Sequence, residues 1–145
     1  MVKGHLLEIV DKLEALLSET AALQRDYVSR VCAACQSPCC LKVHYVYNTK
    51  DILFLRLSKR WLVWKRDLLT NKGCWFLGEK GCIIDPVSRP FICHTYICQD
   101  LEAEMKRRDP GLTAVLNEKF KIIGRMRTQL RTEFFSVKNP YCDPG

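Results

Sequence analysis

The first feature of the chain is a long run in which apolar and polar residues alternate with the period of a helix. Apolar side chains recur at steps of three, four or seven across residues 4–30, with Thr20 filling the one gap. Lys12, Glu19 and Arg25 fall on the opposite face. The spacing predicts an amphipathic helix over residues 4–30 that packs one face against a core. Its predicted core positions are Leu6, Ile9, Leu13, Leu16, Leu23 and Tyr27.

A short strand and a second helix are predicted next. Residues 41–47 carry an apolar or aromatic side chain at every other position, which is typical of a strand. Asn48 or Thr49 can then cap a helix, with Asp51 near the positive end of its dipole. We expect this helix to continue to Thr70 and to be mostly buried. Its two tryptophans could stack on nucleic-acid bases, but their phase with the other apolar positions favours a place in the core. These positions are Phe54, Leu57, Trp61, Trp64 and Leu68.

The middle of the chain predicts a hairpin and then a further helix. Two short β-rich runs flank a loop with two glycines in residues 74–84, which indicates a hairpin or knuckle that could present a cysteine from each run. Ser88 is a candidate cap, and Pro90 stands in the first turn of the helix that follows. Cys93 lies in that turn, and helical character continues to Arg108.

A last helix is predicted over residues 110–135, after the break at residues 109–111. Its remaining surface is basic. That surface is the best candidate for binding an anionic partner such as a nucleic acid, although a solvated face is the simpler interpretation. Its apolar face consists of Leu112, Leu116, Phe120, Ile123, Met126, Leu130 and Phe134, and its basic residues are Lys119, Lys121, Arg125, Arg127 and Arg131.

These patterns predict a mainly α fold with a small β-hairpin or knuckle. A chain of 145 residues with 48% hydrophobic residues is long enough to build its own core. We expect a single cysteine-rich metal-binding domain over residues 1–145, with a cysteine-cluster core at 32–98. The long N- and C-terminal helices at 4–30 and 110–135 flank it. We find no internal repeat and no linker.

The candidate chemistry lies in two sets of four cysteines. Cys32, Cys35, Cys39 and Cys40 follow the pattern C-x2-C-x3-C-C, and the second set is Cys74, Cys82, Cys93 and Cys98. Thiolates in such numbers are the ligands of zinc and of iron–sulfur clusters. The ninth cysteine, Cys142, is interpreted as a free thiol.

Local geometry limits how these thiols can share a metal. Adjacent residues point in different directions, so Cys39 and Cys40 more easily serve two centres, or one larger cluster and a second role. In a continuous helix Cys93 and Cys98 would lie roughly 140° apart, and both could face one ion only if the helix broke. His94 would share a face with Cys98. We interpret it as a surface histidine or a hydrogen-bonding neighbour of the ligands, with direct ligation as the alternative.

Charge and the N-terminal residues bear on location and partners. The start of the chain intersperses charged residues among apolar ones, which excludes a signal peptide or membrane span there. We therefore expect the cytoplasm, where clustered thiols stay reduced and disulfides are disfavoured. The formal net charge is +7 with neutral cysteines. Eight thiolates around two Zn²⁺ ions would lower it to +3, which weakens the case for nucleic acid.

With both sets laid out, the motif C-x2-C-x3-C-C…C-W-F-L…G-C-I-I-D-P…R-P-F-I-C-H-T-Y-I-C resembles the YkgJ-type cysteine-cluster family, described as zinc- or iron-chelating domains. The resemblance spans Cys32 to Cys98 and implies that all eight cysteines are metal ligands. His94 occupies a position that is usually basic in the family. One branch of the family resembles bacterial flagellin lysine methylases, whose cysteine domain is thought to carry an iron–sulfur cluster. The present chain has no G-x-G-x-x-G fingerprint, so methylase activity is not transferred to it.

The leading hypothesis is a cytoplasmic metal-binding module, with an iron–sulfur cluster slightly favoured over zinc. The second is a component of a metal-dependent redox or methyl-transfer enzyme, with Arg89, His94 and Tyr96 beside the centre. The third is a basic zinc module that binds nucleic acid through the helical face from Lys119 to Arg131. The sequence leaves open whether the centre is catalytic.

Overall fold

The fold is described from a computed structural model of the chain. Among the described residues it is mainly helical, as the sequence predicts. Two predictions lie outside the described residues. They are the strand over residues 41–47, apart from Tyr47, and the core positions of Trp61 and Trp64. The structure describes residues 2–32, 47–59, 69–70, 73–74, 77–78, 81–82, 85–95 and 97–138.

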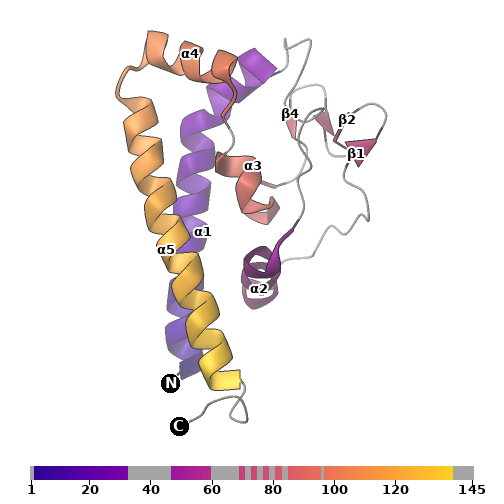
Figure 1. Cartoon of the computed structure of the whole chain (residues 1–145), viewed down its shortest axis with the longest axis vertical. Coiled ribbons are helices and arrows are strands. Elements are labelled where there is room, and N and C mark those ends of the chain that lie inside the picture. Colours follow the sequence, from indigo (N-terminus) through magenta and orange to yellow (C-terminus); the bar gives the residue numbers. More distant parts are fainter. Residues whose placement is uncertain are drawn as a thin grey trace.

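Two long helices form the framework of the molecule. α1 (Val2–Tyr27) and α5 (Leu112–Lys138) lie side by side and run in opposite directions (Figure 1). α1 passes directly into η1, a π-helical turn at Val28–Cys32. The predicted helices over residues 4–30 and 110–135 are therefore confirmed, with ends that differ by a few residues.

The buried face of α1 differs slightly in phase from the predicted one. Leu17 and Gln24 are buried, whereas the predicted core residues Leu16 and Leu23 are only partly buried. The observed stripe shares Leu6, Ile9 and Leu13 with the predicted one and departs from it by one residue at Leu17 and again at Gln24. The buried positions of α1 are Leu6, Ile9, Val10, Leu13, Leu17, Thr20 and Gln24.

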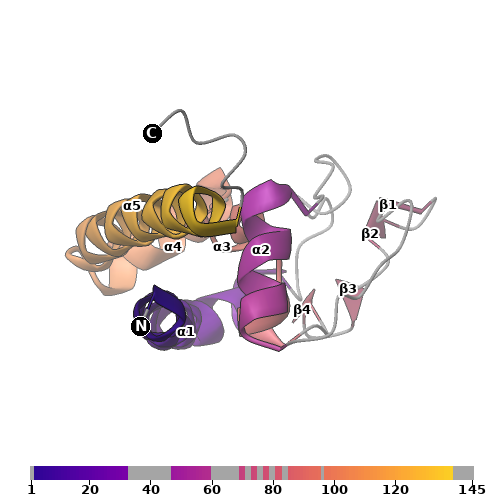
Figure 2. The same ribbon diagram turned by 90° about the horizontal axis from the view of Figure 1, so that it is seen from below.

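α2 (Thr49–Leu57) packs against both long helices (Figure 2). Its N-cap is Asn48, whose side chain accepts a hydrogen bond from the Asp51 N–H at 3.0 Å. The Asp51 carboxylate in turn accepts a hydrogen bond from the Asn48 N–H at 2.9 Å. This reciprocal pair satisfies two backbone donors at the start of the helix, which fixes where α2 begins.

The prediction that this helix continues to Thr70 is wrong. α2 ends at Leu57, and Lys59 adopts a φ of 57°, a left-handed conformation that stops a helix. The Lys59 N–H donates to the Arg56 carbonyl at 3.2 Å, which closes the last turn. Thr70 itself belongs to a strand. The apolar run carried no glycine or proline to signal this end.

Two short antiparallel pairings follow α2. β1 (Leu69–Thr70) pairs with β2 (Gly73–Cys74), and β3 (Leu77–Gly78) pairs with β4 (Gly81–Cys82). Cys82 stands opposite Leu77 in the second pairing. Each pairing covers only two residues per strand, so the hairpin or knuckle predicted for residues 74–84 stays a prediction.

Three short helical elements complete the described fold: η3 (Pro86–Ser88), α3 (Phe91–Thr95) and α4 (Gln99–Arg108). α4 lies across the ends of the long helices and packs against η1 and α5 (Figure 1). It forms a second apolar cluster there, whose buried members are Leu101, Met105, Leu112 and Leu116. The break predicted at residues 109–111 is confirmed. None of the described helices combines the length and apolar character that crossing a bilayer requires.

Candidate metal centre

Cys93 lies in the first turn of α3, as predicted. Its N–H donates to the Pro90 carbonyl at 2.9 Å, and its side chain is half-buried. The predicted cap, Ser88, is not the cap of this helix, because it belongs to the preceding 3₁₀ turn. The Phe91 N–H instead donates to the carboxylate of Asp51 at 3.0 Å. A side chain from α2 therefore does what a local cap was expected to do.

The helix breaks between Cys93 and Cys98. α3 ends at Thr95, and Cys98 is the N-cap of α4 with an extended backbone. The Cys98 Sγ accepts a hydrogen bond from the Leu101 N–H at 3.4 Å. The angular separation that would keep Cys93 and Cys98 from facing one ion in a continuous helix does not apply. The predicted shared face of His94 and Cys98 does not apply either. Neither of the two described cysteine side chains, Cys93 and Cys98, is in a disulfide.

His94 is a core residue. Only 3% of it is exposed, so the expectation of a surface histidine is wrong. Burial is the main cause that lowers the pKa of His94 to about 4, and the positive charge of Arg89 adds to it. A hydrogen bond to the Pro86 carbonyl acts in the opposite direction but does not outweigh these two effects. The ring is therefore neutral near pH 7, and its Nε2 has no hydrogen-bond partner within the described part of the chain.

Among the described side chains, His94 is not grouped with cysteines as a ligand set. Within the described ranges no three His, Cys, Asp or Glu side chains converge as metal ligands would. Arg89 is half-buried, and its N–H donates to the Pro86 carbonyl at 3.2 Å. Its charge acts on the His94 ring.

Three segments that carry or adjoin cysteines of both sets meet at the π-helical turn η1. Cys32 is its last residue. β4, which ends at Cys82, lies against η1. α4, which begins after Cys98, also packs against it, and Cys98 lies in the same apolar cluster as Val28 and Val31. Short π-helical turns occur frequently at functional sites. The backbone of Cys74 lies in β2, paired with β1. Cys35, Cys39, Cys40, Tyr96 and Cys142 lie outside the described residues.

The basic face predicted on α5 is partly neutralised. The Lys119 Nζ lies 2.6 Å from a carboxylate oxygen of Glu19 on α1. Arg127 is buried rather than solvated, since only 8% of it is exposed. Lys121 lies 3.5 Å from Glu118 on its own helix. A face for a polyanion would have to do without Arg127, which weakens the nucleic-acid hypothesis.

The contacts that three buried polar residues make with α3 were missed by the sequence interpretation. Gln24, Asp51 and Arg127 are all buried, and each contacts α3 from a different helix. Arg127 lies between Ile123 and Leu130 on the buried stripe of α5, and Gln24 follows Thr20 on the buried stripe of α1. A polar residue in phase with a core stripe is the signal that could have identified both.

No family model, curated protein or solved structure matches this chain. The resemblance to the YkgJ-type family therefore rests on the cysteine motif alone.

Proposed function

We propose that this chain is a metal-binding cysteine-cluster protein that holds an iron–sulfur cluster or zinc through its two sets of cysteines. The observation that carries the proposal is the meeting at η1 of segments from both sets. Cys32 ends that turn, β4 with Cys82 lies against it, and Cys98 packs in its apolar cluster. Distant parts of a chain that bring cysteines together are what a polydentate thiolate site requires.

The donor chemistry fits such a group. Cys93 and Cys98 are half-buried and are not in disulfides, as ligands must be, and a reducing compartment such as the cytoplasm would keep them so. The Leu101 N–H that donates to the Cys98 Sγ is the kind of contact that surrounds ligand sulfurs in metal sites. The break after Thr95 lets Cys93 and Cys98 approach one centre from separate elements.

The finer parts of the proposal concern the ligand set and the metal. All eight cysteines of the motif are proposed as ligands, with residues 74–84 forming the knuckle that presents Cys74 and Cys82. The cluster is slightly favoured over two zinc sites, because the doubled Cys39 and Cys40 suit one small tetrahedral ion poorly. When bound, the group would supply either electron transfer as a cluster or structural cross-linking as zinc.

The deciding experiment is metal analysis with an absorption spectrum on anaerobically purified full-length protein. A brown protein with iron, acid-labile sulfide and a broad visible band supports the cluster. A colourless protein with stoichiometric zinc supports the zinc alternative. A colourless protein without stoichiometric metal would refute the proposal.

Cysteine variants test the ligand assignment in the same preparation. Cys82→Ala and Cys98→Ala are each expected to lower the metal content, because each removes a thiolate. Cys142→Ala is the matched control, since the ninth cysteine is outside the motif, and its metal content should equal that of the wild type. Unchanged metal in both Cys82→Ala and Cys98→Ala would contradict the assignment.

A further inference from the structure

α3, which contains Cys93, is too short to hold its own conformation. It has five residues, and an isolated helix of this length does not form in water because nucleation is unfavourable. Its conformation must therefore come from contacts with the rest of the molecule. Buried polar side chains supply such contacts at both of its ends.

The N-terminal end of α3 is held by α2. The Asp51 Oδ1 accepts the Phe91 N–H at 3.0 Å and also lies 2.5 Å from the Arg127 guanidinium. The Asp51 Oδ2 accepts the Asn48 N–H at 2.9 Å, so both carboxylate oxygens have donors. One carboxylate thus joins the first residue of α3 to α2 and α5 in a buried setting.

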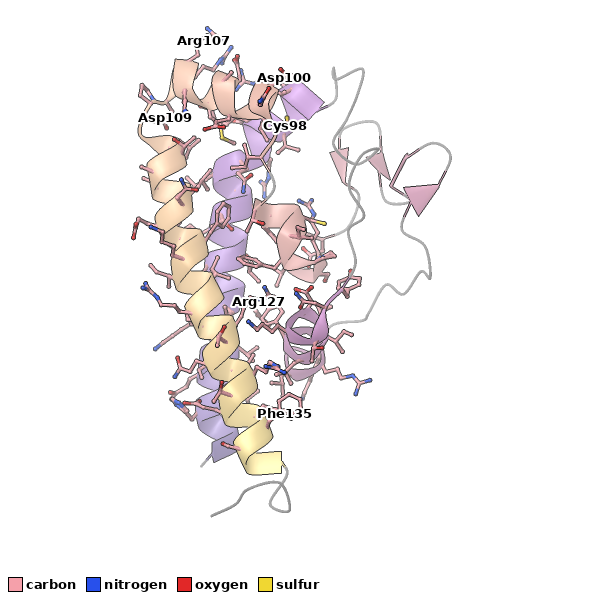
Figure 3. The ribbon with its side chains drawn as sticks, in the orientation of Figure 1. Cys98, Asp100, Arg107, Asp109, Arg127 and Phe135 are labelled. Atoms are coloured by element: carbon pink, nitrogen blue, oxygen red, sulfur yellow. The ribbon has the colours of Figure 1, made fainter. Side chains whose placement is uncertain are left out.

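Arg127 of α5 also holds the N-terminal end of α3 through the ring of Phe91. The Arg127 guanidinium carbon lies 4.4 Å from the centre of that ring, within the range of a cation–π contact. Figure 3 shows Arg127 extending from α5 toward α2 and α3. α5 therefore contacts both the backbone cap and the first side chain of α3.

The C-terminal end of α3 is held by α1. The Gln24 Nε2 donates to the His94 carbonyl at 3.2 Å, and to the Thr20 carbonyl of its own helix at 3.4 Å. Gln24 is 6% exposed, so this bond is shielded from water. Cys93 thus lies between an end fixed by Asp51 and Arg127 and an end fixed by Gln24.

We infer that Gln24, Asp51 and Arg127 are positioning residues that hold the Cys93 sulfur in place for the metal centre. The inference rests on the proposed function. None of the three is a ligand. They act through Phe91 and His94, which flank the ligand turn, as residues around metal sites commonly fix the ligands they contact. A cysteine on an unrestrained turn would bind the metal with lower affinity, because the turn would lose conformational entropy when the metal binds.

The test compares metal affinity in full-length variants that keep every cysteine. Gln24→Met removes the bond to the His94 carbonyl at similar side-chain volume. Asp51→Asn removes the charge opposite Arg127 while leaving an oxygen for the Phe91 N–H. Ile9→Val is the control, since Ile9 is a buried apolar residue of α1 that donates no hydrogen bond to α3 and loses only a methylene group. Metal loss to a competing chelator is followed by metal analysis of the protein, with helix content checked by circular dichroism.

Gln24→Met and Asp51→Asn are expected to bind metal about 10–100-fold more weakly than wild type, as is typical for residues that orient ligands. Ile9→Val should remain within about twofold, although it too is destabilised. If metal-loaded wild type and a folded Gln24→Met variant release metal alike, the positioning role is refuted and the proposed function stands. Wild type without metal would refute the proposed function and this inference with it.

Discussion

The carboxylate of Asp51 and the guanidinium of Arg127 lie 2.5 Å apart between α2 and α5, with 7% and 9% of their side chains exposed. Burial lowers the pKa of Arg127, and the charge of Asp51 opposes that effect. An arginine nevertheless remains protonated in a protein. Two helices far apart in the sequence are therefore joined by a charge pair whose members depend on each other.

Removing one member of this pair should be strongly destabilising. Arg127→Met leaves the Asp51 carboxylate buried without its counter-charge, which typically costs about 3–5 kcal/mol of unfolding free energy. Urea denaturation followed by circular dichroism measures this loss. The double variant Asp51→Asn with Arg127→Met should lose less than Arg127→Met alone, because the neutral amide needs no counter-charge. A loss below about 1 kcal/mol for the single variant would mean that the pair is solvated.

Gly124 offers a stabilising substitution. It lies inside α5, where a Cβ would meet no atom within 4 Å. Gly124→Ala should therefore raise the unfolding free energy by about 0.5–1 kcal/mol, since alanine loses less backbone entropy in a helix. Thermal denaturation measures the gain. Gly4→Ala, in the first turn of α1, should gain less because helix ends fray. A lower melting temperature for Gly124→Ala would show that the site is crowded.

His94 should make the metal-free protein sensitive to acid. Its pKa is about 4 in the folded state, and the ordinary value of 6.5 applies to the unfolded chain. Unfolding therefore takes up a proton between pH 4 and pH 6.5. Its stabilising contribution is complete above pH 6.5 and is lost as the pH falls toward 4, by up to about 3 kcal/mol.

Urea titrations of the metal-free protein between these two pH values measure this loss. His94→Gln has no titrating ring, so the difference in slope between the wild type and this variant isolates the histidine. Equal slopes for the two proteins would mean that His94 is accessible to protons in the folded state.

Removing the metal should lower the melting temperature of the protein. A ligand that binds only the folded state stabilises it, so a chelator removes that contribution. The shift should be large in the wild type and in Cys142→Ala, and small in Cys98→Ala. Differential scanning calorimetry with and without chelator measures it. An equal shift in the wild type and in Cys98→Ala would show that Cys98 does not hold the metal.

The sequence predicted the elements that depend on local pattern. The helices over residues 4–30 and 110–135 carry long apolar stripes, and the capping role of Asn48 follows from its side-chain chemistry. The sequence did not predict the helix break before Cys98. It indicated only that Cys93 and Cys98 could bind one ion if the helix broke between them. The end of α2 at Leu57 was not foreseen, because the left-handed Lys59 is not a residue type that marks a helix end.

The contacts around Cys93 could not be read from neighbouring residues. Ser88 was the local candidate for a cap, but the donor of Phe91 is satisfied by Asp51, 40 positions away. Arg127 was assigned to a solvated face because it is charged, although it occupies a core position of α5. Such pairings depend on tertiary packing, which a periodicity within one helix does not contain. The buried position of His94 was missed for the same reason.

The dependence of α3 on Arg127 has a consequence for dissecting the chain. A fragment cut to residues 32–98 would retain all eight motif cysteines and would lack α1 and α5. In such a fragment the Asp51 carboxylate would lack the guanidinium of Arg127, and the apolar side of α2 would be exposed to water. Transplanting the cysteine motif into another scaffold would therefore also require the side chains of α1, α2 and α5 that hold α3.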